Sequence, residues 1–236
     1  MIIERSPGEC IIVPESSAID RVEVEYGEYE YCVERGFGKY TVWYGDGSKR
    51  TFDRSNCSFV RNWEPYHIIE YGLSFTEDGS MFLSGNWDKG LFAVDSYTGE
   101  TVWHYKKSRI RNIFVFRDYA VVLRFGVSVI KLDLHSGELL NEIPGKSFES
   151  CWRMDERHVM LDRKYNSLYI LNSETMSIVK TIPNSVFNPR DCLSCCVQDA
   201  WMEDKIIMIK GFEQYPNRNR SLSETANFVR ALGVLE

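Results

Sequence analysis

A unit of about 40 residues repeats along this chain and constrains its fold more than any other feature. The segment LFAVDSYTGETVW (91–103) is followed by VIKLDLHSGELLNEI (129–143) and by LYILNSETMSIVKTI (168–182). Their turns align Asp95, Asp133 and Asn172 at spacings of 38 and 39 residues. A constant period of this size is typical of architectures in which each supersecondary unit buries its faces by stacking on its neighbours.

Each copy is preceded by a polar turn and a short apolar strand, as in FTEDGSMFLSG (75–85), VFRDYAVVLRF (115–125) and RMDERHVMLDR (153–163). The full unit therefore predicts a four-stranded antiparallel meander, which is the size of a propeller blade. In the second turn of each unit, Asp or Asn bonds the backbone, and Gly99 or Gly137 supplies a left-handed conformation four residues later. Met176 stands at that place in the third copy, which predicts a different turn geometry there.

These units resemble the quinoprotein-like and WD-type β-propeller repeats. The segment 91–103 is similar to the alcohol-dehydrogenase-type propeller repeat, with A-V-D in one strand, T-G in the turn and W in the next strand. The resemblance covers residues 67–183 well and 190–211 weakly. It implies an all-β fold, a small β-propeller of about five four-stranded blades, incomplete or open as one alternative. Because a quinone needs a propeller of about eight blades, no cofactor is expected.

The two ends of the chain are less regular, and we expect them to complete one domain over residues 1–236. Residues 19–63 alternate like strands and predict a divergent first blade, and residues 190–236 predict the last blade. The segment SLSETANFVRALG (221–233) predicts a short C-terminal helix, with Ser221 and Glu224 as a capping box. A strand at 9–14 is then expected to complete the last blade.

Charge and cysteine content limit the partners. The net charge is −6, and the first 34 residues hold nine acids and two bases, a net of −7. An acidic segment repels nucleic acid and attracts basic proteins, although alternating Glu also suits the wet face of an edge strand. With seven cysteines, no export signal and no long apolar run, we expect a cytoplasmic protein that binds neither nucleic acid nor membrane and is a monomer.

The sequence offers little catalytic or metal-binding chemistry. Cys192, Cys195 and Cys196 have a C-x-x-C spacing, but zinc usually takes two such pairs, so we expect no metal. The four histidines occupy unrelated positions in the repeats, and no phosphate loop or nucleophile elbow is present. We therefore expect a protein that is not an enzyme.

Aromatic and basic residues recur in one variable loop of the repeat, between its second and third strands. In a propeller these loops share one rim with the connections between blades, and aromatic residues beside arginine are typical of a binding surface. The alternative is that these residues reflect the ordinary polar composition of loops and form no binding surface. The predicted binding residues are Trp87, Phe125, Tyr165, Phe212, Tyr215, Arg109, Arg111, Arg124, Arg163 and Lys164.

Three classes of function remain open on these grounds. The leading hypothesis is a non-catalytic propeller that binds a protein partner, with a bacterial immunity or inhibitor protein for a toxin as its more specific form. The second is a small hydrolase or lyase with its site in the central channel. The third is a carbohydrate or anion binder that uses the basic, aromatic rim.

Overall fold

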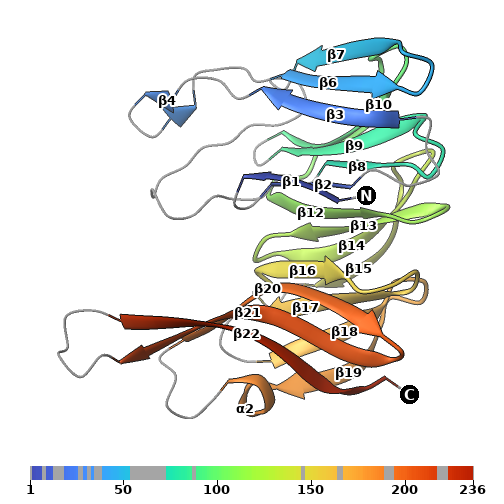
Figure 1. The fold of residues 1–236 in the computed structure, drawn as a ribbon. Coiled ribbons are helices and arrows are strands. Elements are labelled where there is room, and N and C mark those ends of the chain that lie inside the picture. Colours follow the sequence, from blue (N-terminus) through green and yellow to red (C-terminus); the bar gives the residue numbers. More distant parts are fainter. Residues whose placement is uncertain are drawn as a thin grey trace. The chain divides into compact units, whose positions relative to one another are not determined.

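The computed structural model describes residues 2–6, 9–12, 19–25, 29–30, 33–34, 39–53, 73–86, 89–144, 147–163, 167–188, 194–216 and 223–235. Within these ranges the chain is built of β-strands, with α2 (Asn184–Phe187) as the helical segment (Figure 1). No helix among the described residues has the length and apolar character to span a membrane. The chain divides into two compact units, Met1–Glu142 and Ile143–Glu236, and the single domain expected above stays a prediction.

Two sheets of the first unit follow the predicted repeat. One meander consists of β8 (Leu73–Phe75), β9 (Met81–Asn86), β10 (Gly90–Asp95) and β11 (Thr101–Tyr105). The next consists of β12 (Ile110–Val115), β13 (Tyr119–Arg124), β14 (Ser128–Asp133) and β15 (Leu139–Pro144). The residues of β10 and β13 are mostly buried on both faces, which is why these strands read as apolar runs.

The N-terminal part of the first unit forms two further sheets. Strands β3 (Ile19–Glu25), β6 (Lys39–Tyr44) and β7 (Lys49–Asp53) make a three-stranded antiparallel sheet, and β4 (Tyr29–Glu30) pairs with β5 (Val33–Glu34). The three-stranded sheet lies within the predicted first blade, of which residues 26–28, 31–32, 35–38 and 54–63 are outside the described ranges. Tyr44 joins it to the next sheet, because its hydroxyl donates to the Ser96 carbonyl and its ring stacks on Tyr97 at 5.1 Å.

The second unit contains two antiparallel sheets. The first is a four-stranded meander of β16 (Ser150–Arg153), β17 (His158–Arg163), β18 (Ser167–Asn172) and β19 (Ser177–Pro183). The second has three strands, β20 (Ser194–Glu203), β21 (Ile206–Pro216) and β22 (Ser223–Val234). Met160 and Ile170 of the first sheet share one apolar core with Ile207 and Ile209 of the second.

The aligned turn residues occupy equivalent places, as the repeat predicts. The side-chain oxygens of Asp95, Asp133 and Asn172 each accept hydrogen bonds from the backbone N–H groups two and three residues later, at 2.7–3.0 Å. In each turn the backbone N–H four residues after this Asp or Asn donates to its carbonyl oxygen. Three residues therefore close the same turn by the same local chemistry.

The prediction of a different geometry for the turn of the third copy, Asn172 to Met176, is wrong. Met176 has φ +57°, beside +77° for Gly99 and +72° for Gly137, so all three residues are left-handed. The Met176 side chain is only 6% exposed. Burial of this large apolar side chain offsets the roughly 1–2 kcal/mol that a left-handed backbone costs a residue with a Cβ.

The predicted C-terminal helix is also wrong, because residues 223–234 form β22. This strand pairs with β21 from Ser223, opposite Pro216, to Val234, opposite Ile206. Its burial alternates with period two: Phe228, Arg230 and Leu232 are at least partly buried, whereas Val229 is 59% exposed. The open edge of β21 offers backbone partners along its length, and this long-range pairing overrides the helical spacing of the apolar residues.

The N-terminal strand does not complete the last sheet, contrary to expectation. β2 (Glu9–Ile12) pairs with β1 (Ile2–Ser6) and, in parallel, with β8, where Ile11 lies opposite Leu73. The sheet of β8–β11 thus grows to six strands, with order β1-β2-β8-β9-β10-β11. The outer edge of β8 provides this pairing, and such an edge has no signature in a linear sequence.

Candidate functional site

Arg111 and Phe125 form a cation–aromatic pair at one end of the β12–β15 sheet. Phe125 lies in the tight turn between β13 and β14, and the Arg111 guanidinium carbon is 4.9 Å from the centre of its ring. Arg111 is an extra residue in its strand, because Ile110 pairs with Arg124 and Asn112 with Leu123. A bulge changes the direction of the side chain it carries. Here the bulged residue is Arg111, whose guanidinium lies over the Phe125 ring.

Two more predicted residues lie against this pair. The backbone N–H of Phe125 donates to the carbonyl of Arg109 at 2.8 Å, and Arg109 is an exposed residue with φ +66°. Arg124 is partly buried and is held inside the sheet by hydrogen bonds to the Ser108 carbonyl and the Ser128 hydroxyl, and by an ion pair with Glu142. We call Arg109, Arg111, Arg124 and Phe125 the Arg–Phe cluster.

Tyr105 lies near this cluster, although the sequence patterns did not indicate it. Its ring packs against the core of the first unit, and burial raises the pKa of its hydroxyl, while the charge of Arg124 opposes that rise. Tyr105 of β11 is therefore close enough to Arg124 to be influenced by its charge. Tyr105 is the last residue of β11, and its neighbours in sequence do not form a turn motif. Its position near Arg124 therefore depends on how the sheets pack.

The other predicted binding residues are distributed differently. Phe212, Tyr215 and Arg163 are partly buried residues of the second unit. The Tyr215 hydroxyl donates to Glu213 at 2.5 Å, and the same carboxylate pairs with Arg230, so this hydroxyl serves an internal network. Trp87, Tyr165 and Lys164 lie outside the described residues, and the binding role of all ten residues stays a prediction.

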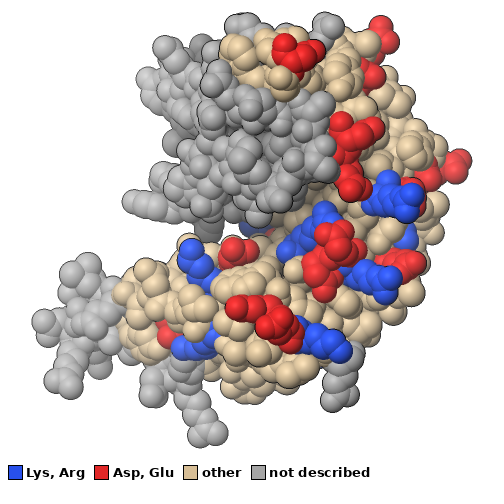
Figure 2. Space-filling model, turned by 45° about the vertical axis from the view of Figure 1, so that its right-hand side comes forward, with Lys and Arg blue, Asp and Glu red and all other residues tan. Residues whose placement is uncertain are grey.

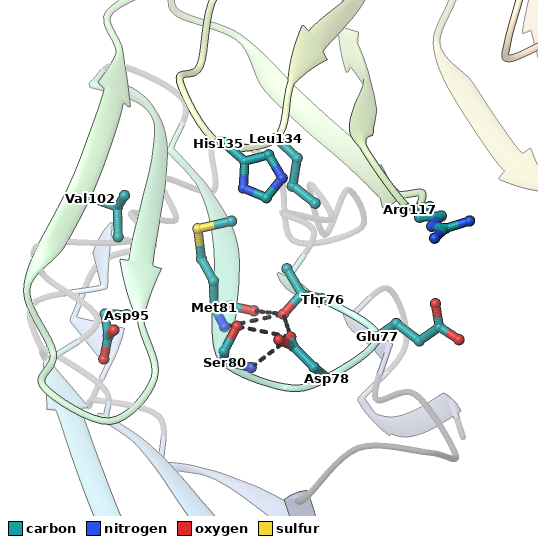
Figure 3. A pocket seen from close by; sticks show the side chains of 10 residues that line it. All are labelled: Thr76, Glu77, Asp78, Ser80, Met81, Asp95, Val102, Arg117, Leu134 and His135. Atoms are coloured by element: carbon teal, nitrogen blue, oxygen red, sulfur yellow. Dashed lines mark hydrogen bonds between the residues drawn. The ribbon is translucent and has the colours of Figure 1, made fainter.

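A hollow of about 590 Å³ lies at the other end of the strands of the first unit. Alternate turns of an antiparallel meander lie at opposite ends of its sheet, and this hollow is formed by the turns that follow β8, β10, β12 and β14. It is lined by Thr76, Glu77, Asp78, Ser80, Met81, Asp95, Val102, Arg117, Leu134 and His135 (Figure 3). We refer to it as the acidic hollow. No pattern in the sequence indicated this hollow.

Asp78 is held firmly at the base of the acidic hollow. Its Oδ1 accepts hydrogen bonds from the Thr76 hydroxyl at 2.6 Å and from the Ser80 backbone N–H and hydroxyl at 3.0 and 2.8 Å. The bond from Thr76 is the main reason that the pKa of Asp78 lies below its ordinary value, while burial opposes this shift and Ser80 adds to it. Asp78 is therefore a fixed anion at neutral pH.

A bulge in β11 turns Val102 toward the hollow. Ala93 pairs with Trp103 and Val94 with Thr101, so Val102 is an extra residue, and it is 52% exposed. Val179 is the extra residue at the equivalent place in β19 and is 48% exposed. The repeated exposed valine is visible in the aligned sequences, but the bulge that exposes it is not.

The described residues offer no evident metal centre. Among them, no three His, Cys, Asp or Glu side chains gather as metal ligands do. Cys195 is partly exposed and Cys196 exposed, both on β20, and Cys192 falls outside the described part of the chain. On the face drawn in Figure 2, acidic and basic side chains are interspersed.

Comparisons with known proteins bear on the fold. No protein-family model matches the sequence, and no curated protein matches it. Among solved structures, BamB from Moraxella catarrhalis is similar over 89% of this chain and 64% of its own, with a TM-score of 0.53 and 14% identity. A chain in the crystal structure of the mitotic checkpoint complex is similar over 89% of this chain and 68% of its own, with a TM-score of 0.53 and 12% identity. This chain thus spans just under two thirds of BamB, and the likenesses support a mostly β fold with β-propeller-like blades.

Proposed function

We propose that this protein is a non-catalytic binding protein that holds a protein partner through the Arg–Phe cluster. The observation that carries the proposal is the placement of the Arg111 guanidinium 4.9 Å from the centre of the partly exposed Phe125 ring. Arginine and large aromatic residues are enriched among the anchors that dominate interface energies. The likeness to a chain of the mitotic checkpoint complex, an assembly of proteins, is compatible with such a role.

The local structure suits recognition because it fixes the backbone that carries Phe125 and places the Arg111 guanidinium against its ring. The backbone N–H of Phe125 is bonded to the Arg109 carbonyl. Arg111 is the bulged residue of β12, next to Ile110, which pairs with Arg124. Arg124 supports the turn from within through its bonds to Ser108 and Ser128. A surface whose side chains are already ordered loses less conformational entropy when a partner binds.

A bacterial immunity or inhibitor role towards a toxin is a more specific form of this proposal. Its support is the acidic composition of residues 1–34, which would attract a basic protein. The proposal further holds that the protein acts without catalysis and in the cytoplasm.

The test is affinity capture from cells of the source organism, followed by titration of the purified partner against variants. Arg111→Ala and Phe125→Ala should each weaken binding by about thirtyfold, because truncating an interface anchor typically costs about 2 kcal/mol. Lys131→Ala is the matched control, since Lys131 forms another cation–aromatic pair with Tyr119, at 3.7 Å, in the same sheet. The melting temperature of every variant is measured alongside.

The control separates binding from packing. A partner that binds the Arg111→Ala, Phe125→Ala and Lys131→Ala variants equally well contradicts the proposed surface. Loss of binding that follows loss of folding would make the pair a structural element instead. Arg111→Lys adds a finer test, because lysine keeps the charge but not the planar group that stacks on an aromatic ring.

A further inference from the structure

The acidic hollow combines an anionic base with an apolar wall. Asp78 and Ser80 lie at its base, Asp95 of β10 and Val102 of β11 lie on one side, and Leu134 and His135 lie across from the base (Figure 3). Met81 points from the base toward His135. All ten described lining residues belong to the first unit.

The charges of the hollow favour a cation. Among the lining residues that the structure describes, Glu77, Asp78 and Asp95 contribute three carboxylates, and Arg117, at the edge on the side of Glu77, contributes one guanidinium (Figure 3). Asp78 and Asp95 are both fixed by turn hydrogen bonds to their Oδ1 atoms. Their negative charges therefore stay in place without further ordering when a cation arrives.

The apolar wall indicates an organic cation with a hydrocarbon stem. The bulge of β11 turns Val102 outward, where it is 52% exposed and lines the hollow, and Met81 and Leu134 add further apolar surface. No three carboxylates or other ligating side chains among the described residues converge on one point, as a metal ion would require. Separate carboxylates above an apolar wall match an elongated cationic side chain instead.

We propose that the acidic hollow binds an arginine side chain of the partner protein. The methylene groups would lie against Val102 and Met81, with the guanidinium directed to Asp78 and Asp95. A guanidinium is more weakly hydrated than an ammonium group and presents a planar fork of donors to carboxylates, which favours arginine over lysine. This proposal rests on the proposed protein-binding function for the source of the arginine, but it uses a surface at the other end of the strands.

The test uses Nα-acetyl-arginine amide as the probe and the ¹⁵N-labelled full-length protein. The amide resonances of Ser80, Tyr97, Thr98 and His135 should shift saturably, with a dissociation constant of roughly 1 mM because one side chain offers few contacts. Nα-acetyl-citrulline amide, the uncharged analogue, should cause no saturable shift. Saturable binding of both probes, or shifts spread over the whole chain, would overturn the proposal.

Two variants with matched controls localise the effect. Asp95→Asn should weaken probe binding about two- to fivefold, the value expected for a partly exposed ion pair. Asn172 accepts the same two backbone bonds in the third copy, so asparagine preserves this turn. Asp46→Asn is the control, because Asp46 bonds Ser48 in another turn of the same unit and does not line the hollow.

The second variant is Val102→Ser, which should also weaken probe binding, and its control is Val179→Ser at the equivalent bulge of the second unit. Equal affinity for Asp95→Asn, Val102→Ser and both controls would contradict the proposal. This titration needs no partner, whereas the proposed function is tested with the partner and with Arg111 and Phe125 variants. The failure of one is therefore distinguishable from the failure of the other.

Discussion

The indole Nε1 of Trp103 donates a hydrogen bond of 2.8 Å to the carbonyl oxygen of Leu134. Trp103 belongs to β11 and Leu134 follows β14, so this bond joins two successive sheets of the first unit. Gly137 leaves room for the ring, because a Cβ at that position would lie 2.6 Å from Trp103 Cε3. The turn that Asp133 closes thus supplies both an acceptor and a space for the tryptophan of the neighbouring sheet.

Substitution of Gly137 by alanine should destabilise the first unit. The new Cβ would meet the Trp103 ring, and the residue would keep the left-handed φ of +72° that favours glycine. Gly126→Ala is the matched control, since Gly126 has φ +64° but no atom within 4 Å of an added Cβ. We expect Gly137→Ala to cost about 1–3 kcal/mol more in unfolding free energy than Gly126→Ala, measured by urea denaturation. Equal costs would show that Trp103 does not need the glycine.

Two tryptophans make comparable bonds in different surroundings, which predicts unequal costs for the same substitution. Trp152 Nε1 donates to the Gln198 carbonyl at 2.9 Å, and Gln198 is the extra residue at a bulge in β20. Trp103 is 8% exposed, whereas Trp152 is only partly buried. Trp103→Phe should therefore cost about 1 kcal/mol more than Trp152→Phe, because a buried carbonyl without a donor is costlier than one that water can reach. Calorimetric unfolding of both variants measures the difference, and a larger cost for Trp152→Phe would contradict it.

The buried, left-handed Met176 leads us to expect that the wild type is more stable than Met176→Gly, and Met176→Gly more stable than Met176→Ala. Met176→Gly removes the left-handed strain but also the buried side chain, and should cost about 1–3 kcal/mol in unfolding free energy. Met176→Ala loses the side chain and keeps the strain, so it should be less stable than Met176→Gly by about 1 kcal/mol. Chemical denaturation of the three proteins checks this order. A Met176→Gly protein more stable than the wild type would mean that burial does not offset the strain.

Asp78 predicts a pH-dependent contribution to stability. The pKa of this carboxyl lies below its ordinary value, chiefly because the Thr76 hydroxyl donates to it, and the Ser80 bonds add to the effect against the opposing influence of burial. A group whose pKa is lower in the folded state stabilises the fold above its unfolded pKa of about 3.9, and this contribution is lost as the pH falls through the folded value. Asp78→Asn should thus reduce unfolding free energy at about pH 6 and make little difference at about pH 2.

Urea denaturation across that pH range tests the Asp78 prediction. Glu203→Gln serves as the control, because Glu203 is an exposed carboxylate next to the turn of Asp204 and Lys205. A wild-type advantage over Asp78→Asn that grows as the pH falls would reverse the expected sign. An advantage that stays constant would show that the folded environment does not favour the ionised form of this carboxyl.

The repeat was accessible from the sequence because its chemistry is local. Asp95, Asp133 and Asn172 bond backbone groups only two and three residues away, so the turns carry the same signature wherever the chain lies. The Arg–Phe cluster was anticipated in part for a similar reason, since Phe125 sits in a tight turn between two apolar strands. These features need no knowledge of what packs against them.

The tertiary structure alone decided the features that depend on distant partners. Residues 223–234 have helical spacing in sequence, but the open edge of β21 makes them a strand, and the edge of β8 takes β2 in the same way. Met176 tolerates a left-handed backbone because burial of its side chain offsets the cost, and Val102 lines the acidic hollow because β11 bulges against β10. Local hydrogen bonds are encoded within a few residues, whereas edge pairing, burial and bulges are settled by free energies that arise only when separate segments meet.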